Sequence, residues 1–135
     1  MRSRFLRPIR LALGGLLVLP FTALAGPPPS VNQMLELKPT QRFVDYDTPT
    51  AEVMPTLKAE VVTEGKATGW VLRDPSGRPY RKFMDTNRDN VVDQWRYYHD
   101  GVEVYRDTDT NFNGRADEFR WMNFGGSRWG IDRNE

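Results

Sequence analysis

The chain has 135 residues, no cysteine and a single histidine, with 19 basic against 18 acidic side chains. This length accommodates one domain, and the lack of cysteine excludes both a disulfide framework and a cysteine-ligated zinc site. The near balance of charge argues against a nucleic-acid partner, which needs a strongly basic face.

The first 25 residues have the pattern of a secretory signal peptide. Four arginines come before an apolar run: Arg2, Arg4, Arg7 and Arg10. Ala23-Leu24-Ala25 has the small-x-small pattern that signal peptidase accepts. An uncleaved membrane anchor is the alternative, but glycines and a proline interrupt a run that is short for a span. We therefore expect cleavage after Ala25, a secreted, periplasmic or cell-surface location, and no membrane span in the remainder. The remainder carries 15 basic and 18 acidic side chains, a net charge of −3.

Residues 26–50 are predicted to form a Pro-rich extended linker. The segment GPPPS at 26–30 is stiff and cannot join a helix or a ladder. Ser30 is a suitable N-cap for two helical turns over Val31–Leu37, which Pro39 would end. From Arg42 to Pro55, prolines and threonine-rich polar residues argue against a long regular element, so we expect an extended segment with at most one short strand.

Residues 51–84 predict a short antiparallel β-meander. Three segments have the composition of short strands, separated by EGK and DPSGR: Leu57–Thr63, Ala67–Arg73 and Pro79–Phe83. Asp74-Pro75-Ser76-Gly77 has the proline and glycine positions of a type I turn. Trp70, a large apolar residue on the second strand, is expected to pack in the core.

Residues 85–135 contain an internal repeat with steps of 24 and 23 residues, from Asp85 to Asp109 to Asp132. DTNRDNVVDQWRYYHDG aligns with DTNFNGRADEFRWMNFGG, and a third, truncated copy begins at DRNE. The dipeptide Asp100-Gly101 favours a type I′ hairpin between strands at 92–99 and 102–106. The sequence thus predicts an all-β fold, a meander followed by tandem β-hairpin repeats.

Each full copy opens with a polar loop that has oxygen-bearing side chains at positions 1, 3, 5 and 9. With a backbone carbonyl at position 7, such a loop can wrap a hard cation such as Ca²⁺. Position 6 must bend sharply, and Asn90 and Gly114 tolerate positive φ. The predicted calcium ligands are Asp85, Asn87, Asp89, Val91 and Asp93 in the first loop and Asp109, Asn111, Asn113, Arg115 and Asp117 in the second.

The loops resemble the DxDxDGxxD calcium loops of EF-hands, dockerins, thrombospondin type 3 repeats and FG-GAP repeats. An EF-hand has a glutamate at position 12, where this chain has Arg96 and Arg120. Because aromatic, strand-forming residues follow each loop, the FG-GAP context is the most similar. The repeat with DNVVDQWRYYHDG and SRWGID also resembles secreted proteins of planctomycete bacteria, a resemblance that implies no activity.

Other interpretations of these residues remain open. The loops could be Asx-rich turns that bind nothing. The aromatic residues Trp95, Tyr97, Phe119, Trp121 and Trp129 could form a sugar-binding platform, although we expect them to alternate faces, one set packing in the core and Arg96 and Arg120 outside. His99 is expected to be an exposed turn residue.

The sequence therefore favours a non-catalytic, secreted calcium-binding structural or interaction module, with another extracellular or cell-surface protein as its expected partner. The alternatives are a dockerin-like docking domain, with helices after the loops, and a secreted hydrolase that uses paired carboxylates.

Overall fold

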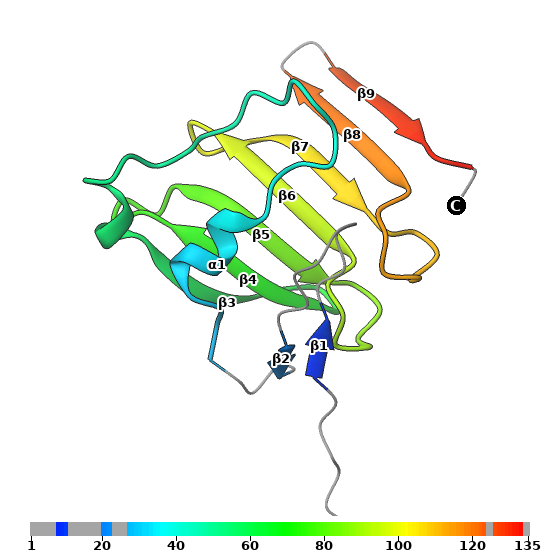
Figure 1. Ribbon diagram of the computed structural model, residues 1–135, viewed down its shortest axis with the longest axis horizontal. Helices are drawn as coiled ribbons and strands as arrows, with labels where there is room; N and C mark the ends of the chain where they lie inside the picture. The colour runs from blue at the N-terminus through cyan, green and yellow to red at the C-terminus, as the bar shows by residue number, and fades with distance from the viewer. Residues whose placement is uncertain (1–7, 11–19, 23–26, 124–125, 134–135) are drawn as a thin grey trace, which may run out of the picture.

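The computed structural model describes residues 8–10, 20–22, 27–123 and 126–133. Its main element is one antiparallel sheet whose seven strands lie in chain order (Figure 1). The strands are β3 Lys58–Glu64, β4 Ala67–Arg73, β5 Pro79–Asp85, β6 Gln94–His99, β7 Val102–Thr108, β8 Glu118–Asn123 and β9 Gly126–Ile131. The predicted all-β class is confirmed, with the meander and the hairpin repeats forming one continuous sheet.

Three smaller sets of elements complete the fold. Strands β1 Pro8–Arg10 and β2 Pro20–Thr22 pair with each other in a separate two-stranded sheet. The helix α1 spans Val31–Glu36, and a 3₁₀ helix, η1, spans Met54–Thr56. The expected cleavage site at Ala25 lies outside the described residues, as do the last two residues of the third repeat copy.

The predicted turns form as their residues require. The amide of Gly77 donates to the carbonyl of Asp74 at 2.9 Å, which closes the turn between β4 and β5. Asp100 and Gly101 both have positive φ, 46° and 79°, as a type I′ turn between β6 and β7 demands. These local signals set the pairing of neighbouring strands.

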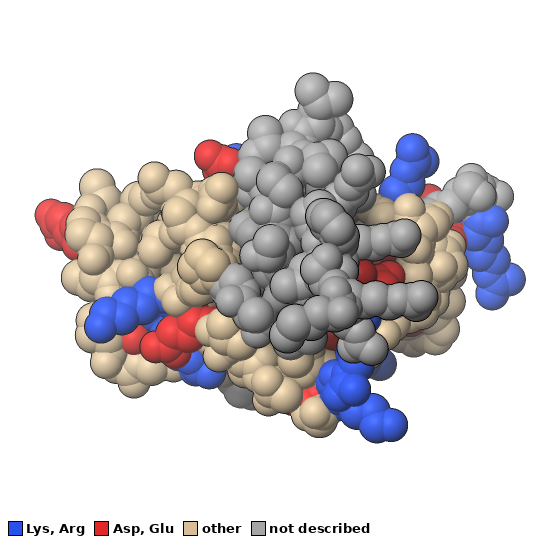
Figure 2. Space-filling model, turned by 90° about the horizontal axis from the view of Figure 1, so that it is seen from below, with Lys and Arg blue, Asp and Glu red and all other residues tan. Residues whose placement is uncertain are grey.

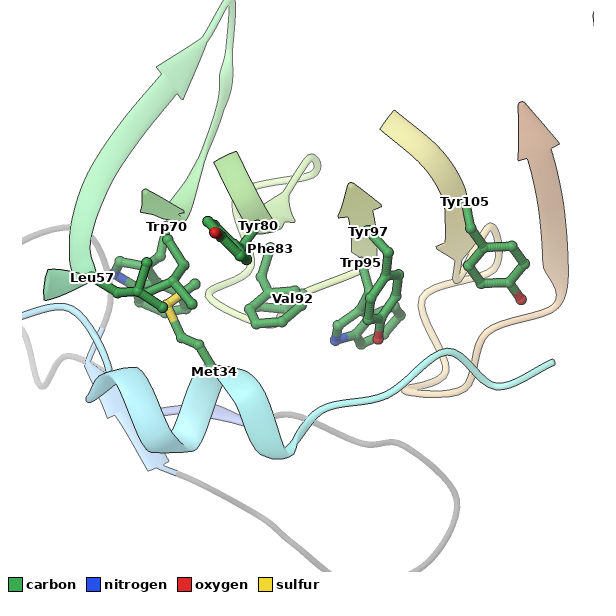
Figure 3. Close-up of a cluster of buried hydrophobic side chains, with 10 residues drawn as sticks. Met34, Leu57, Trp70, Tyr80, Phe83, Val92, Trp95, Tyr97 and Tyr105 are labelled. Atoms are coloured by element: carbon green, nitrogen blue, oxygen red, sulfur yellow. The ribbon is translucent and has the colours of Figure 1, made fainter. Parts of the chain in front are cut away.

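One face of the sheet carries most of the core. The register aligns Trp70, Phe83 and Trp95 in one row across β4, β5 and β6. Tyr97, two residues after Trp95 in β6 and therefore on the same face, lies opposite Tyr105 of β7. All five side chains are at most 4% exposed, and they line the same side of the sheet in Figure 3. The expected core role of Trp70 is therefore confirmed.

Residues 27–57 pack on this aromatic face. Helix α1 lies in front of the sheet, and Met34 points from it into the core, where it is 1% exposed (Figures 1 and 3). Val44 and Tyr46 also pack against the cluster. The amide of Asp47 donates to the carbonyl of Tyr98 at 2.9 Å. The segment expected as an extended linker therefore forms the second layer of the domain.

Helix α1 is short and depends on its N-terminal cap. The Ser30 side chain accepts from the Gln33 amide, and the Gln33 side chain accepts from the Ser30 amide, which together make a capping box. We expect Ser30→Ala to lower the free energy of unfolding by about 1 kcal/mol, and Ser30→Asp to leave it within about 0.5 kcal/mol. Urea denaturation followed by tryptophan fluorescence measures both. Equal stabilities of Ser30→Ala and the parent protein would contradict this role of the cap.

The opposite face carries a row of basic residues. Lys82, Arg96, Arg106 and Arg120 lie opposite one another on four successive strands. Like charges in register repel, and two glutamates offset this repulsion. Glu64 bonds both Lys82 and Arg96, and Glu103 bonds Arg106. The hydrogen bond from Lys82 is the main reason why the pKa of Glu64 is lowered. Arg96 is therefore outside the core and paired, as expected.

The aromatic residues of the repeat do not all lie on the same face of the sheet. Trp95 and Tyr97 are fully buried, and Phe119 and Trp121 are partly buried against the same cluster. Trp129 differs, because it pairs with Arg120 on the opposite face and is 58% exposed. Most of the aromatic residues are therefore core residues.

Candidate functional site

The two polar loops lie side by side at the same end of the strands. The first joins β5 to β6, and the second joins β7 to β8, so both emerge where alternate strands end (Figure 1). The amide of Asp109, at position 1 of the second loop, donates to the carbonyl of Asp93, at position 9 of the first, at 2.8 Å. The amide of Asp132 makes the same 2.8 Å bond to the carbonyl of Asp117. The same backbone hydrogen bond therefore links each copy of the repeat to the next.

The aspartate at position 1 organises each loop from inside. Asp85 accepts hydrogen bonds from the amides of Arg88 (2.7 Å) and Asn90 (2.9 Å). Asp109 accepts from the amides at positions 5 and 6, those of Asn113 (3.2 Å) and Gly114 (2.7 Å). In both loops the second carboxylate oxygen bonds the position 6 amide, so the chain curls around the carboxylate.

The aspartate at position 9 closes each loop onto its second residue. The Asp93 carboxylate accepts from the amide and the hydroxyl of Thr86, at 2.9 and 2.8 Å. The Asp117 carboxylate accepts from the amide and the hydroxyl of Thr110, at 2.7 and 2.6 Å. Neither threonine is among the residues predicted from the sequence, although both loops begin with the letters DTN. That repeated threonine was the available signal.

The two loops share an unusual backbone conformation. At position 6, φ is 70° for Asn90 and 94° for Gly114, which confirms the bend expected there. At position 4, φ is also positive, 67° for Arg88 and 60° for Phe112. Residues with a side chain rarely adopt positive φ, and such strain persists only where the surroundings impose it. The two loops have different residues at position 4, yet the rest of each loop holds that position in the same backbone conformation.

The predicted ligands at positions 3 and 5 are exposed. The side-chain oxygen Oδ1 of Asn87 accepts from the Asp89 backbone amide at 3.1 Å, and the Asp89 carboxylate accepts from the Val91 backbone amide at 2.8 Å. In the second loop the Asn111 and Asn113 side chains accept from the amides two residues on, as in an Asx-turn. Val91 and Arg115 thus contribute amides to the loops, and their carbonyls remain the predicted position 7 ligands.

Position 8 fixes each loop to the core. Val92 is 0% exposed and belongs to the main hydrophobic cluster, and Ala116 packs against the same cluster. Burial of a valine side chain contributes about 2 kcal/mol. Each loop is therefore held at its base by an apolar contact, and only positions 2 to 5 are exposed in both loops.

The loops contain buried negative charge. Asp85, Asp93, Asp109 and Asp117 are between 1% and 6% exposed. Within the described part of the chain, no lysine or arginine forms an ion pair with any of them. Burial raises the pKa of Asp85 and of Asp93, and the charges of Asp89 and Asp85, respectively, add to the effect. Buried charges in proteins are normally paired or bound to metal, and here only hydrogen bonds compensate them.

The first-loop carboxylates do not converge at one point in this structure. Among the described residues, one group of three acidic or histidine side chains has its ligand atoms within 4.8 Å of one another: Asp47, His99 and Asp100. Asp89 instead accepts from the Asn87 amide group at 3.1 Å. A cation at the first loop would have to draw Asp89 away from Asn87.

His99 was expected to be an exposed turn residue, but it is the last residue of β6, beside the Asp100-Gly101 turn, and is partly buried. It contacts acids on both sides. Its Nδ1 lies 3.4 Å from Asp47, and its Nε2 lies 3.5 Å from Asp100. The Asp47 carboxylate also accepts from the Asp100 amide at 2.8 Å. Arg78 approaches Asp100 at 3.4 Å, which makes this cluster less attractive to a cation. The cluster ties residues 45–47 to the sheet.

A further buried carboxylate, that of Asp107, adjoins the second loop. Asp107 is 0% exposed and accepts from the Thr40 amide (3.0 Å), the Thr40 hydroxyl (2.6 Å) and the Tyr105 hydroxyl (2.5 Å). Burial raises the pKa of Asp107 despite these bonds. Thr40 is 67 residues away in sequence, so no local pattern could reveal the contact.

Within the described part of the chain, no helix is long and apolar enough to cross a membrane. Comparisons with known protein families, with curated proteins and with solved structures gave no match to this chain.

Proposed function

We propose that the protein is a non-catalytic, exported calcium-binding module whose two loops each hold one Ca²⁺ at one end of the strands of a single β-sheet. The observation that carries the proposal is the burial of an aspartate pair in each loop, Asp85 with Asp93 and Asp109 with Asp117, without an ion-paired lysine or arginine. The same loop conformation occurs twice, 24 residues apart, which supports a shared role for the two pairs.

The chemistry of the loops fits calcium better than other metals. Their side chains offer carboxylate and amide oxygens and neither sulfur nor imidazole nitrogen, and Ca²⁺ prefers oxygen ligands in a flexible geometry. The hydrogen bonds to the position 1 and position 9 carboxylates leave further lone pairs on each oxygen. The proposed ligands are those predicted from the sequence, with Asp89 and Asn113 at position 5 turning inward on binding.

A structural or interaction role follows from where the loops lie. They join β5 to β6 and β7 to β8 and are hydrogen-bonded to each other, so calcium would stabilise the end of the sheet where both lie. The face seen in Figure 2 shows basic and acidic side chains of the described residues interspersed, without a large patch of either sign. The net charge of −3 after residue 25 favours an extracellular protein over a polyanion as a partner. A dockerin-like domain would need helices after the loops, where this fold has β6 and β8.

Thermal unfolding with and without calcium tests the proposal. Weak extracellular sites have dissociation constants of about 10⁻³ M, so about 10 mM free Ca²⁺ should add about 1.4 kcal/mol per site. We expect the melting temperature to rise by several degrees and calorimetry to detect two sites. Mg²⁺ at equal ionic strength should have a much smaller effect. An unchanged melting temperature and no heat of binding at 10 mM Ca²⁺ would refute the proposal.

A further inference from the structure

A cavity of about 240 Å³ lies between α1, the segment that follows it and the aromatic face of the sheet. Its walls combine four apolar or aromatic side chains with two cationic ones: Leu35, Tyr46, Pro49, Met54, Lys38 and Arg81. None of the described residues that line it is acidic. A more open hollow beside it shares Leu35, Lys38 and Met54, and Glu36 is the acidic residue of that outer hollow.

Arg81 is the unusual residue of this cavity. It is 1% exposed on strand β5, and within the described part of the chain no carboxylate forms an ion pair with it. One guanidinium nitrogen, Nη1, donates to the carbonyls of Tyr80 (2.7 Å) and Asp47 (2.9 Å). The buried Nε has no hydrogen-bond partner. The charge of the Asp47 carboxylate also acts on Arg81, from beyond ion-pair distance. A buried cation without a directly paired anion is costly, and an unmade hydrogen bond adds to that cost.

Two aromatic rings hold the guanidinium in place. Its central carbon lies 4.5 Å from the ring centre of Tyr46 and 5.4 Å from that of Tyr97. The rings partly compensate the charge and fix the plane of the guanidinium, and a planar, fixed guanidinium is suited to binding a carboxylate by two parallel hydrogen bonds. Burial lowers the pKa of Arg81 from its usual value, but an arginine stays protonated in proteins. The charge therefore calls for an anion.

We propose that this cavity binds a small organic monocarboxylate with an apolar body, with the carboxylate against Arg81 and the apolar part between Leu35, Tyr46 and Met54. Lys38, which is exposed, adds attraction at the mouth. Cavities for drug-sized ligands are about 300–1,000 Å³, so this smaller one fits a short-chain or single-ring acid. The site is separate from the calcium loops and does not depend on them.

Titrations with two matched pairs of compounds test the site on the full chain. Benzoate and hexanoate carry the proposed carboxylate, whereas benzyl alcohol and hexanol carry the same apolar body without charge. We expect each acid to shift amide resonances of α1 and β5 in ¹H–¹⁵N spectra with millimolar affinity, and each alcohol to bind at least tenfold more weakly. Equal affinities of an acid and its alcohol, or shifts confined to other elements, would overturn the proposal.

Variants separate the charge from the cavity. Arg81→Met should weaken benzoate binding at least tenfold, and Lys38→Gln should weaken it a few-fold. Arg128→Met is the matched control, since Arg128 stacks on Trp121 (5.0 Å) away from the cavity, and it should bind benzoate normally. If Arg81→Met does not fold, Met54→Trp should abolish binding, because the larger side chain of this lining residue would fill the cavity. Unchanged benzoate affinity in Lys38→Gln and in Met54→Trp would refute the site.

Discussion

Gly69→Ala is expected to lower the free energy of unfolding by about 3 kcal/mol, the upper part of the range for overpacking in a well-packed interior. A Cβ atom on Gly69 would lie 1.9 Å from the carbonyl oxygen of Phe83 and 2.9 Å from the Cα of Met84. Both of these atoms belong to the backbone of β5, so no side-chain rotation can relieve the overlap. Strands β4 and β5 would have to separate.

The damage would spread because Gly69 lies within the ladder that aligns the core. It pairs with Met84, and its neighbour Trp70 pairs with Phe83. Separation of the strands at this point would disturb the row of aromatic residues. The measurement is urea denaturation monitored by circular dichroism and by tryptophan fluorescence.

Gly130→Ala is the matched control, also a glycine-to-alanine change within a strand. A Cβ on Gly130, in β9, would have no neighbour within 4 Å. We expect its stability to change by less than about 0.5 kcal/mol, because alanine restricts the unfolded chain slightly and adds no overlap. Similar stabilities of the two variants would show that β4 and β5 are not as close as the structure places them.

Local signals in the sequence were enough for most elements of the sheet. Strand β4 has the predicted bounds, and β5 and β7 each extend two residues beyond them. Asp100-Gly101 determined its turn because few residue pairs accept positive φ twice. The helix signal was also local, since Ser30 and Gln33 cap each other across one turn. Each of these predictions rests on residues within a few positions of one another.

The packing of residues 27–57 could not be predicted in the same way. Prolines and threonines there indicate a chain without long regular elements, and outside α1 and η1 the segment has neither helix nor strand. Its position on the sheet depends on contacts such as Thr40 with Asp107 and Asp47 with Tyr98, which join residues far apart in sequence. Composition therefore predicted the local conformation, and long-range hydrogen bonds and apolar contacts determined the location.

The two candidate sites also differ in whether local sequence signals or long-range contacts determine them. The loops were predictable as units, because oxygen-bearing residues at fixed spacing curl the backbone around themselves. The positive φ at Arg88 and Phe112 was not predictable, since neither residue type favours it. Arg81 lies between Tyr80 and Lys82 in a strand, where an arginine usually reaches solvent. Only the register, which places it opposite Tyr97, and the segment that covers it reveal its burial.

Asp93→Ala is expected to have a combined effect of about 3 kcal/mol at saturating calcium. The variant loses both hydrogen bonds from Thr86, while the backbone bond from residue 93 to Met84 (2.9 Å) and the amide bonds to Asp85 remain. That loss accounts for about 1–2 kcal/mol in the absence of metal. A further loss should appear only with Ca²⁺, because the first loop would lack its ligand at position 9. Melting temperatures of the variant and the parent, each with and without about 10 mM Ca²⁺, separate the two parts.

Thr86→Val is the matched control, because it acts on the same contact from the other side. It removes the hydroxyl bond to Asp93 but keeps the carboxylate and the amide bond. It should cost about 1 kcal/mol with or without calcium, and the stabilisation by Ca²⁺ should remain. Asp117→Ala should repeat the behaviour of Asp93→Ala, because Thr110 holds it in the same way. If calcium stabilised Asp93→Ala and Asp117→Ala as much as the parent protein, these carboxylates would act only as caps of their own turns and would not be ligands of calcium.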